Sequence, residues 1–75
     1  MKIIHCEGNK FLTYEALFRF MIYRNYQSVI IRIEENRVKS REMRVTYDYI
    51  KGILLKEKYN VDEIIRKELE KCGIM

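Results

Sequence analysis

The chain of 75 residues contains no proline, no tryptophan and only three glycines. Linkers and disordered tails are rich in proline, glycine and small polar residues, so neither is predicted. A membrane-spanning helix needs about 18 consecutive apolar residues, and no apolar run in the sequence is that long. The apolar run at the N-terminus is also too short for a signal peptide. We therefore expect one domain over residues 1–75, located in the cytoplasm.

Soft metal ligands and catalytic side chains are also scarce, because the chain has one histidine and two cysteines. His5 and Cys6 are adjacent on a predicted strand, where neighbouring side chains point to opposite faces and do not readily share a metal ion. No glycine-rich phosphate motif and no set of nucleophile, base and orienting group is evident. We expect no metal, cofactor, small-molecule substrate or catalytic residue, and we predict that Cys6 and Cys72 are free, buried thiols.

Three segments repeat apolar residues at the three- and four-residue spacing of an amphipathic helix. Each segment begins with a residue whose side chain can accept a hydrogen bond from the first free backbone amides, namely Thr13, Thr46 or Asn60. Gly73 follows the last segment at a position typical of a helix C-terminal cap. The predicted helices cover residues 13–25, 46–58 and 60–72.

β-Branched residues make two other segments, residues 2–6 and 28–34, favourable for strands. A third strand is indicated where Met43, Val45 and Tyr47 alternate with polar residues. The predicted fold class is α+β, a small single domain with the order β-α-β-β-α-α and helices packed on one face of a short sheet. A helix that crosses from the first strand to the second makes those two strands parallel. The predicted core consists of Leu17, Met21, Ile31, Val45, Ile50, Leu54, Ile65 and Leu69.

Two registers are open for the hairpin formed by the second and third strands. A tight turn at Glu35 and Asn36 pairs Glu34 with Arg37 and sets apolar residues opposite polar ones. A longer connection sets every apolar residue opposite an apolar partner, and a sheet register follows its buried face. We predict the longer connection, which leaves residues 35–41 as a protruding arm or loose hairpin tip. Its pairs are Ile33 with Met43, Ile31 with Val45, and Val29 with Tyr47.

Positive charge is concentrated in residues 37–44, which we call the basic arm. It contains Arg37, Lys39, Arg41 and Arg44 against one acidic residue, so it carries three of the chain's four net positive charges. Neighbouring potentials add, and guanidinium groups match phosphate oxygens, so such a segment attracts a polyanion. We predict a small nucleic-acid-binding protein, a regulator or accessory factor, that contacts DNA or RNA phosphates through these four side chains.

The sequence leaves other function classes open. The charges of the arm also protect a sheet edge from aggregation, in which case the chain is a protein–protein interaction module with incidental basic charge. An enzyme is the least favoured class. A homodimer is expected on size alone, because a domain of this length buries a small core. Six tyrosines are present, but those on apolar helix faces favour packing over base stacking.

Part of the chain also resembles a known family. The segment Tyr59–Leu69 is similar to the second helix of ribbon-helix-helix DNA-binding proteins, with a polar cap, an acidic residue, an Ile-Ile pair, an arginine and a leucine. The preceding helix has Ile50, Ile53 and Leu54 at the spacing of the family's first helix. The resemblance therefore covers residues 46–72 and not the whole chain.

The resemblance implies a strand that pairs with its copy in a second chain and enters the major groove of DNA. Arg41 and Arg44 would then be ribbon residues, and the amides near Asn60 would hold a phosphate. In the family the ribbon alternates apolar and polar residues up to the first helix. This chain departs from that pattern, because Ser40 and Glu42 occupy apolar positions.

Overall fold

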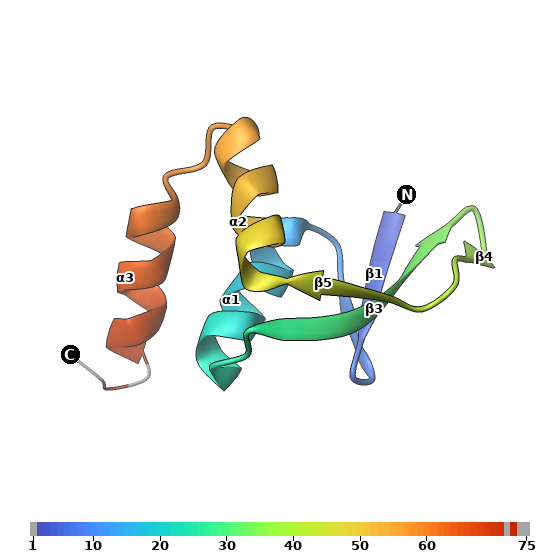
Figure 1. Ribbon diagram of the computed structural model, residues 1–75, viewed down its shortest axis with the longest axis horizontal. Helices are drawn as coiled ribbons and strands as arrows, with labels where there is room; N and C mark the ends of the chain where they lie inside the picture. Colours follow the sequence, from blue (N-terminus) through green and yellow to red (C-terminus); the bar gives the residue numbers. More distant parts are fainter. Residues whose placement is uncertain (1, 72, 74–75) are drawn as a thin grey trace.

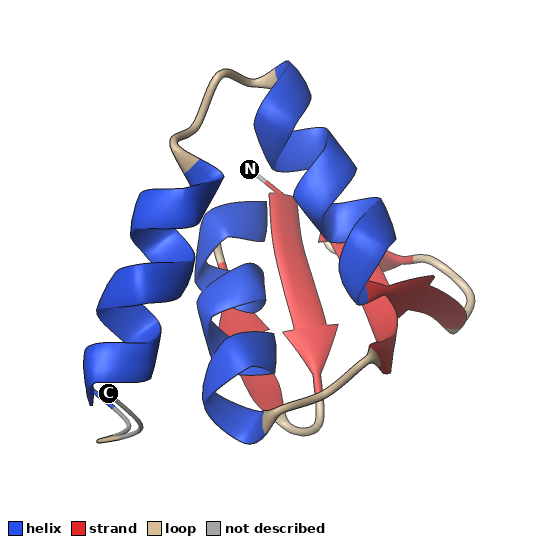
Figure 2. Cartoon of the chain, turned by 60° about the vertical axis from the view of Figure 1, so that its left-hand side comes forward, coloured by secondary structure: helices blue, strands red, loops and turns tan. Residues whose placement is uncertain are grey.

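The computed structural model describes residues 2–71 and residue 73. Figures 1 and 2 show three helices on one side of a five-stranded antiparallel sheet. The predicted α+β class and the packing of the helices on one sheet face are confirmed, and two further short strands join the predicted elements. In chain order the elements are β1 (Lys2–Cys6), β2 (Asn9–Phe11), α1 (Tyr14–Arg24), β3 (Ser28–Glu35), β4 (Val38–Lys39), β5 (Met43–Thr46), α2 (Tyr47–Lys56) and α3 (Val61–Lys71).

A single apolar core lies between the sheet and the helices. On α3 the buried stripe is Val61, Ile64 and Glu68 rather than the predicted Ile65 and Leu69, which are only partly buried. The buried carboxylate of Glu68 accepts a hydrogen bond of 3.0 Å from the guanidinium of Arg19 on α1. The other predicted core residues are confirmed as buried: Leu17, Met21, Ile31, Val45, Ile50 and Leu54.

The three predicted helix N-caps are also confirmed. The side-chain oxygens of Thr13, Thr46 and Asn60 each accept a hydrogen bond of 3.1 Å from the backbone amide three residues later. Such a cap stabilises a helix by about 1 kcal/mol because it satisfies an amide that has no partner within the helix. At the other end of α1, Asn25 adopts the left-handed conformation with a φ of 58°.

β1 and β3 are antiparallel, not parallel as predicted. Glu7 and Gly8 both have positive φ angles, 50° and 81°, and form a tight turn that returns the chain along β2. The sequence pattern does not reveal β2, because the three residues Asn9–Phe11 include no β-branched side chain. Because β2 returns the chain along β1, α1 begins near the end of the sheet where β1 started. β3 then runs antiparallel to β1, with Ile4 opposite Ile33.

The predicted long connection after β3 is also wrong. A tight turn joins β3 to β4 at Asn36 and Arg37, whose φ angles are 53° and 67°. Nearer the helices β3 pairs with β5, and Ile31 lies opposite Met43 rather than Val45. This pairing is displaced by two residues from the predicted one. The buried face is preserved, because side chains alternate between faces with a period of two.

A bulge between β4 and β5 makes the tight turn compatible with the pairing near the helices. Residues 32–33 of β3 lie opposite residues 40–42, so the returning strand has one residue more. Ser40 fixes the bulge. Its amide donates to the Ile33 carbonyl at 2.8 Å, and its hydroxyl accepts from the Ile33 amide at 2.9 Å. The arm is therefore a hydrogen-bonded hairpin and not a loose loop.

Candidate nucleic-acid interface

The structure places the four predicted contact residues at successive levels of this hairpin. Arg37 lies in the tip, Lys39 on β4, Arg41 in the bulge and Arg44 on β5, and all four side chains are exposed. Figure 1 shows the tip of the hairpin projecting from the end of the molecule that is remote from α3. Positive φ angles at both turn residues match the twist of the flanking strands. The hairpin thus presents its cations to solvent on a regular scaffold.

The arm cations have few partners within the described chain. Arg37, Lys39 and Arg41 form no ion pair with any residue in the ranges 2–71 and 73. Arg44 donates a hydrogen bond of 3.1 Å to the hydroxyl of Ser28, which is neutral. The positive charge of the arm is therefore balanced by solvent ions rather than by protein carboxylates.

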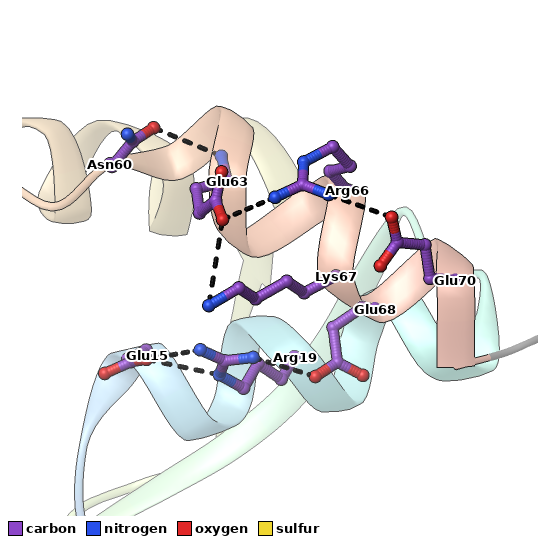
Figure 3. Close-up of polar contacts among 8 residues, drawn as sticks. All are labelled: Glu15, Arg19, Asn60, Glu63, Arg66, Lys67, Glu68 and Glu70. Carbon is purple, nitrogen blue, oxygen red and sulfur yellow. Dashed lines mark hydrogen bonds and ion pairs between the residues drawn. The ribbon is translucent and has the colours of Figure 1, made fainter.

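The cations of α3 are arranged differently, as Figure 3 shows. Arg66 lies between the carboxylates of Glu63 and Glu70, and Lys67 lies 3.7 Å from Glu63. Hydrogen bonding and charge attraction from Glu63 raise the pKa of the Arg66 guanidinium. Lys71 lies 3.6 Å from Glu68. The positive charges of α3 are therefore neutralised by neighbouring glutamates of the same helix.

Sequence reasoning missed two basic residues that the sheet register brings close to the arm. Lys10 on β2 and Arg32 on β3 both lie opposite His5 of β1, so the three side chains form one row on the same sheet face. Arg44 lies opposite Ile30 on that face as well. Lys10 and Arg32 are 22 positions apart in the sequence, and only the β1–β2 hairpin, which the pattern did not reveal, places them together.

The tyrosines that the structure describes do not lie in the arm. The Tyr26 hydroxyl donates to Glu7 at 3.1 Å, and this hydrogen bond is the main cause that raises the pKa of Tyr26. Tyr47 packs on Phe18 with 4.9 Å between ring centroids, and its burial raises its pKa. Tyr49 is exposed and lines a shallow hollow of about 330 Å³ along β5. Packing therefore explains two of these rings, whereas the exposed Tyr49 lies beside β5 at the base of the arm.

The residues implied by the ribbon-helix-helix resemblance are placed as follows. Arg41 lies in the bulge and Arg44 on β5, which pairs with β3 along one edge and with no other described strand. Asn60 stands at the start of α3, where its side-chain oxygen accepts from the Glu63 amide. The strand implied to pair with a second chain thus has one edge available for pairing.

Within residues 2–71 and 73, no group of three or more histidine, cysteine, aspartate or glutamate side chains has the arrangement of a metal site. No helix in the same part of the chain is both long and apolar enough to cross a membrane. Cys6 is a free, buried thiol as predicted, and burial raises its pKa, whereas Cys72 lies outside the described residues. Comparison with family models, curated proteins and solved structures found no match to this chain.

Proposed function

We propose that this protein binds DNA or RNA by contacting phosphates through the basic arm, as a regulator or accessory factor. The observation that carries the proposal is the set of three exposed cations on a projecting hairpin, Arg37, Lys39 and Arg41. None of them pairs with a carboxylate of residues 2–71 or 73. Binding to phosphates releases the ions that surround a nucleic acid, and unpaired protein cations gain most from this exchange. Guanidinium groups also fit two phosphate oxygens at once.

The proposal makes a quantitative statement about salt. Each phosphate neutralised on a duplex contributes about −0.9 to the slope of log K against log salt, so four arm contacts give a slope near −3.6. We would titrate fluorescent duplex and single-stranded probes at several salt concentrations and follow anisotropy. A flat salt dependence with measurable binding would contradict phosphate contact as the source of affinity.

A matched pair of variants tests whether the arm is the contact surface. Replacing Arg37, Lys39 and Arg41 with glutamine should weaken binding about a hundredfold and flatten the salt slope by about three. The control replaces Lys56, Lys58 and Lys67 with glutamine, which removes the same charge from the helical side. The control should bind like the wild type. Equal loss in both variants would mean that only total charge matters.

The second candidate is a protein-interaction module, and one observation favours it. One edge of β5 pairs with no described strand. It lies beside the hollow lined by Met43 and Tyr49, which are 41% and 58% exposed. A strand of another protein, or a second copy in a homodimer, could pair along this edge. Failure of every nucleic-acid probe at micromolar protein in low salt would favour this candidate. Sedimentation of the wild type would then test for a dimer.

A further inference from the structure

A second group of cations lies on the sheet face that the helices leave uncovered. We call this the open sheet face and define it by the register: residues opposite one another on paired strands point to the same side. The face has three rows of cross-strand neighbours. The middle row is Lys10, His5 and Arg32, on β2, β1 and β3. The row toward the tip of the arm is Ile3, Glu34 and Lys39, on β1, β3 and β4, and the row toward the helices is Ile30 and Arg44, on β3 and β5. The alternate residues of these strands point to the helices.

The open sheet face is positive because its four cations, Lys10, Arg32, Lys39 and Arg44, outnumber the carboxylates of Glu34 and Glu42. Glu34 lies directly opposite Lys39, but its carboxylate is 2.6 Å from the Nε2 atom of His5. Glu42 lies 3.4 Å from Arg32 in a pair that is exposed on both sides, and such pairs are weak. Lys10 forms no ion pair with the described residues. The face therefore extends the positive surface of the arm across the whole sheet.

The spacing of these cations suits a backbone of phosphates. Strands lie about 4.8 Å apart, so the row places Lys10 and Arg32 about 10 Å from each other. Lys39 and Arg44 lie on the strands next to β3. Lys39 is opposite Glu34, two residues from Arg32 toward the tip of the arm, and Arg44 is opposite Ile30, two residues from Arg32 toward the helices. Four cations thus occupy one flat surface that is continuous with Arg37 and the tip.

No aromatic ring is available on this surface among the described residues. Its apolar members are Ile3 and Ile30, whereas Phe11 points inward opposite Ile4. Single-stranded nucleic acids are held to a large extent by stacking of their bases on aromatic side chains. A surface with cations and no rings favours the ligand with the higher density of phosphates, and a duplex carries one charge per about 1.7 Å of its axis.

We propose that the open sheet face is part of the nucleic-acid interface and that the ligand is a duplex held by its phosphates. This inference rests on the proposed function and goes beyond it, because it adds Lys10 and Arg32 to the contact surface and selects the duplex. With six contacts in place of four, the salt slope becomes about −5.4. Affinity should depend little on base sequence, because phosphates carry no sequence information.

The test compares two double variants on a 20-base-pair duplex and on its single strand. Replacing Lys10 and Arg32 with glutamine should weaken duplex binding five- to tenfold for each lost contact at 0.1 M salt, and flatten the slope by about 1.8. The control replaces Lys56 and Lys58 with glutamine and should leave both quantities unchanged. Circular dichroism confirms that each variant is folded.

The outcomes separate this inference from the proposed function. Normal binding by the Lys10 and Arg32 variant, together with loss in the arm triple variant, would confine the interface to the arm and overturn the inference alone. Tighter binding of the single strand would overturn the choice of a duplex. If the wild type binds neither probe, the proposed function itself fails.

A gain-of-affinity variant tests the same face without removing a cation. Glu42→Gln removes the carboxylate that lies 3.4 Å from Arg32, and the side chain of Glu42 is 62% exposed, so folding should be unaffected. We expect about fivefold tighter duplex binding and a steeper salt slope, since an additional cation is free to replace a counterion. Unchanged affinity in Glu42→Gln would show that Arg32 does not meet a phosphate.

Discussion

The basic arm and α3 both carry several basic side chains, but those of α3 are paired with carboxylates and those of the arm are not paired with any described carboxylate. On α3 each of Arg66, Lys67 and Lys71 has a glutamate oxygen within 3.7 Å. Of the four cations of the arm, Arg44 alone forms a side-chain hydrogen bond with a described residue, and its partner is the neutral hydroxyl of Ser28. The comparison teaches that carboxylate pairing, rather than the number of basic residues, determines how much positive potential is left for a polyanion.

The difference has a geometric cause. A helix brings residues three and four positions apart together, so the glutamates of α3 lie beside its cations. A hairpin brings cross-strand residues together, and Glu34 lies opposite Lys39. That carboxylate is bound instead by His5, which β1 supplies from the other side of β3. Lys39 forms no ion pair of its own with a described residue.

The largest expected effect comes from reversing the charge of the arm. Arg37→Glu and Arg41→Glu together should reduce duplex affinity by more than about a hundredfold, because two attractive contacts become repulsive. Both residues are exposed and outside the core, so the free energy of unfolding should change by less than about 0.5 kcal/mol. Anisotropy titration and urea denaturation measure the two quantities. Loss of stability in step with affinity would contradict the separation of the arm from the core.

The next effect concerns an ion pair that supports the fold. Arg19 on α1 binds Glu15 at 2.8 Å and the buried Glu68 of α3 at 3.0 Å, as Figure 3 shows. Arg19→Met leaves the Glu68 carboxylate buried without its guanidinium and should destabilise the protein by about 1–3 kcal/mol, with nucleic-acid affinity unchanged. Urea denaturation measures the loss. Adding Glu68→Leu should recover most of it, and failure to recover would mean that Arg19 acts through packing alone.

The same pair shows where sequence reasoning succeeds and where it fails. Helices, caps and most of the core follow from local periodicity, and they were predicted from residues such as Thr13 and Leu17. The binding of Glu68 to Arg19, 49 positions earlier, does not follow from that periodicity. Contacts of this kind depend on how helices pack, which local spacing does not encode.

The sheet illustrates the same limit for the candidate site. The arm cations are adjacent in sequence and could be predicted as a group. The contribution of Lys10 and Arg32 depends on β2, a strand of three residues without a β-branched side chain. The bulge at Ser40 depends on a side-chain hydrogen bond to β3 that compensates for an extra residue. Short strands and bulges carry weak sequence signals because tertiary pairing stabilises them.

A smaller effect is expected from freeing the cations of α3. Glu63→Gln and Glu70→Gln together remove both carboxylates from Arg66 and raise the net charge by two. If only cations near the arm contact the duplex, the affinity for the duplex should rise less than about threefold, because α3 is remote from the arm. Stability should fall by about 0.5–1 kcal/mol, since exposed pairs within a helix are weak. A tenfold gain in affinity would mean that total charge governs binding.

The smallest effect is a pH dependence of stability to which two groups of the core, Tyr47 and Cys6, contribute. Burial raises the pKa of Tyr47 above its ordinary value of 10.0 and that of Cys6 above 9.0. In both cases the unfolded chain loses its proton at a lower pH than the folded chain. The contribution of each group to stability is therefore fully present below its ordinary pKa, and it is lost as the pH rises toward the folded value.

The free energy of unfolding should accordingly decline above pH 9, by at most about 1.4 kcal/mol per pH unit for each group. Tyr47→Phe retains the ring that packs on Phe18 and removes the ionisable hydroxyl. This variant should lose the share of Tyr47 in the decline that begins near pH 10. It should keep the share of Tyr26, whose pKa the hydrogen bond to Glu7 raises, and the part that begins near pH 9. Urea denaturation between pH 7 and 11 measures both. If the profiles of the variant and the wild type superimpose above pH 10, burial of Tyr47 does not couple its ionisation to folding. The expected difference between the profiles would assign the ionisation of Tyr47 to the core between the sheet and the helices.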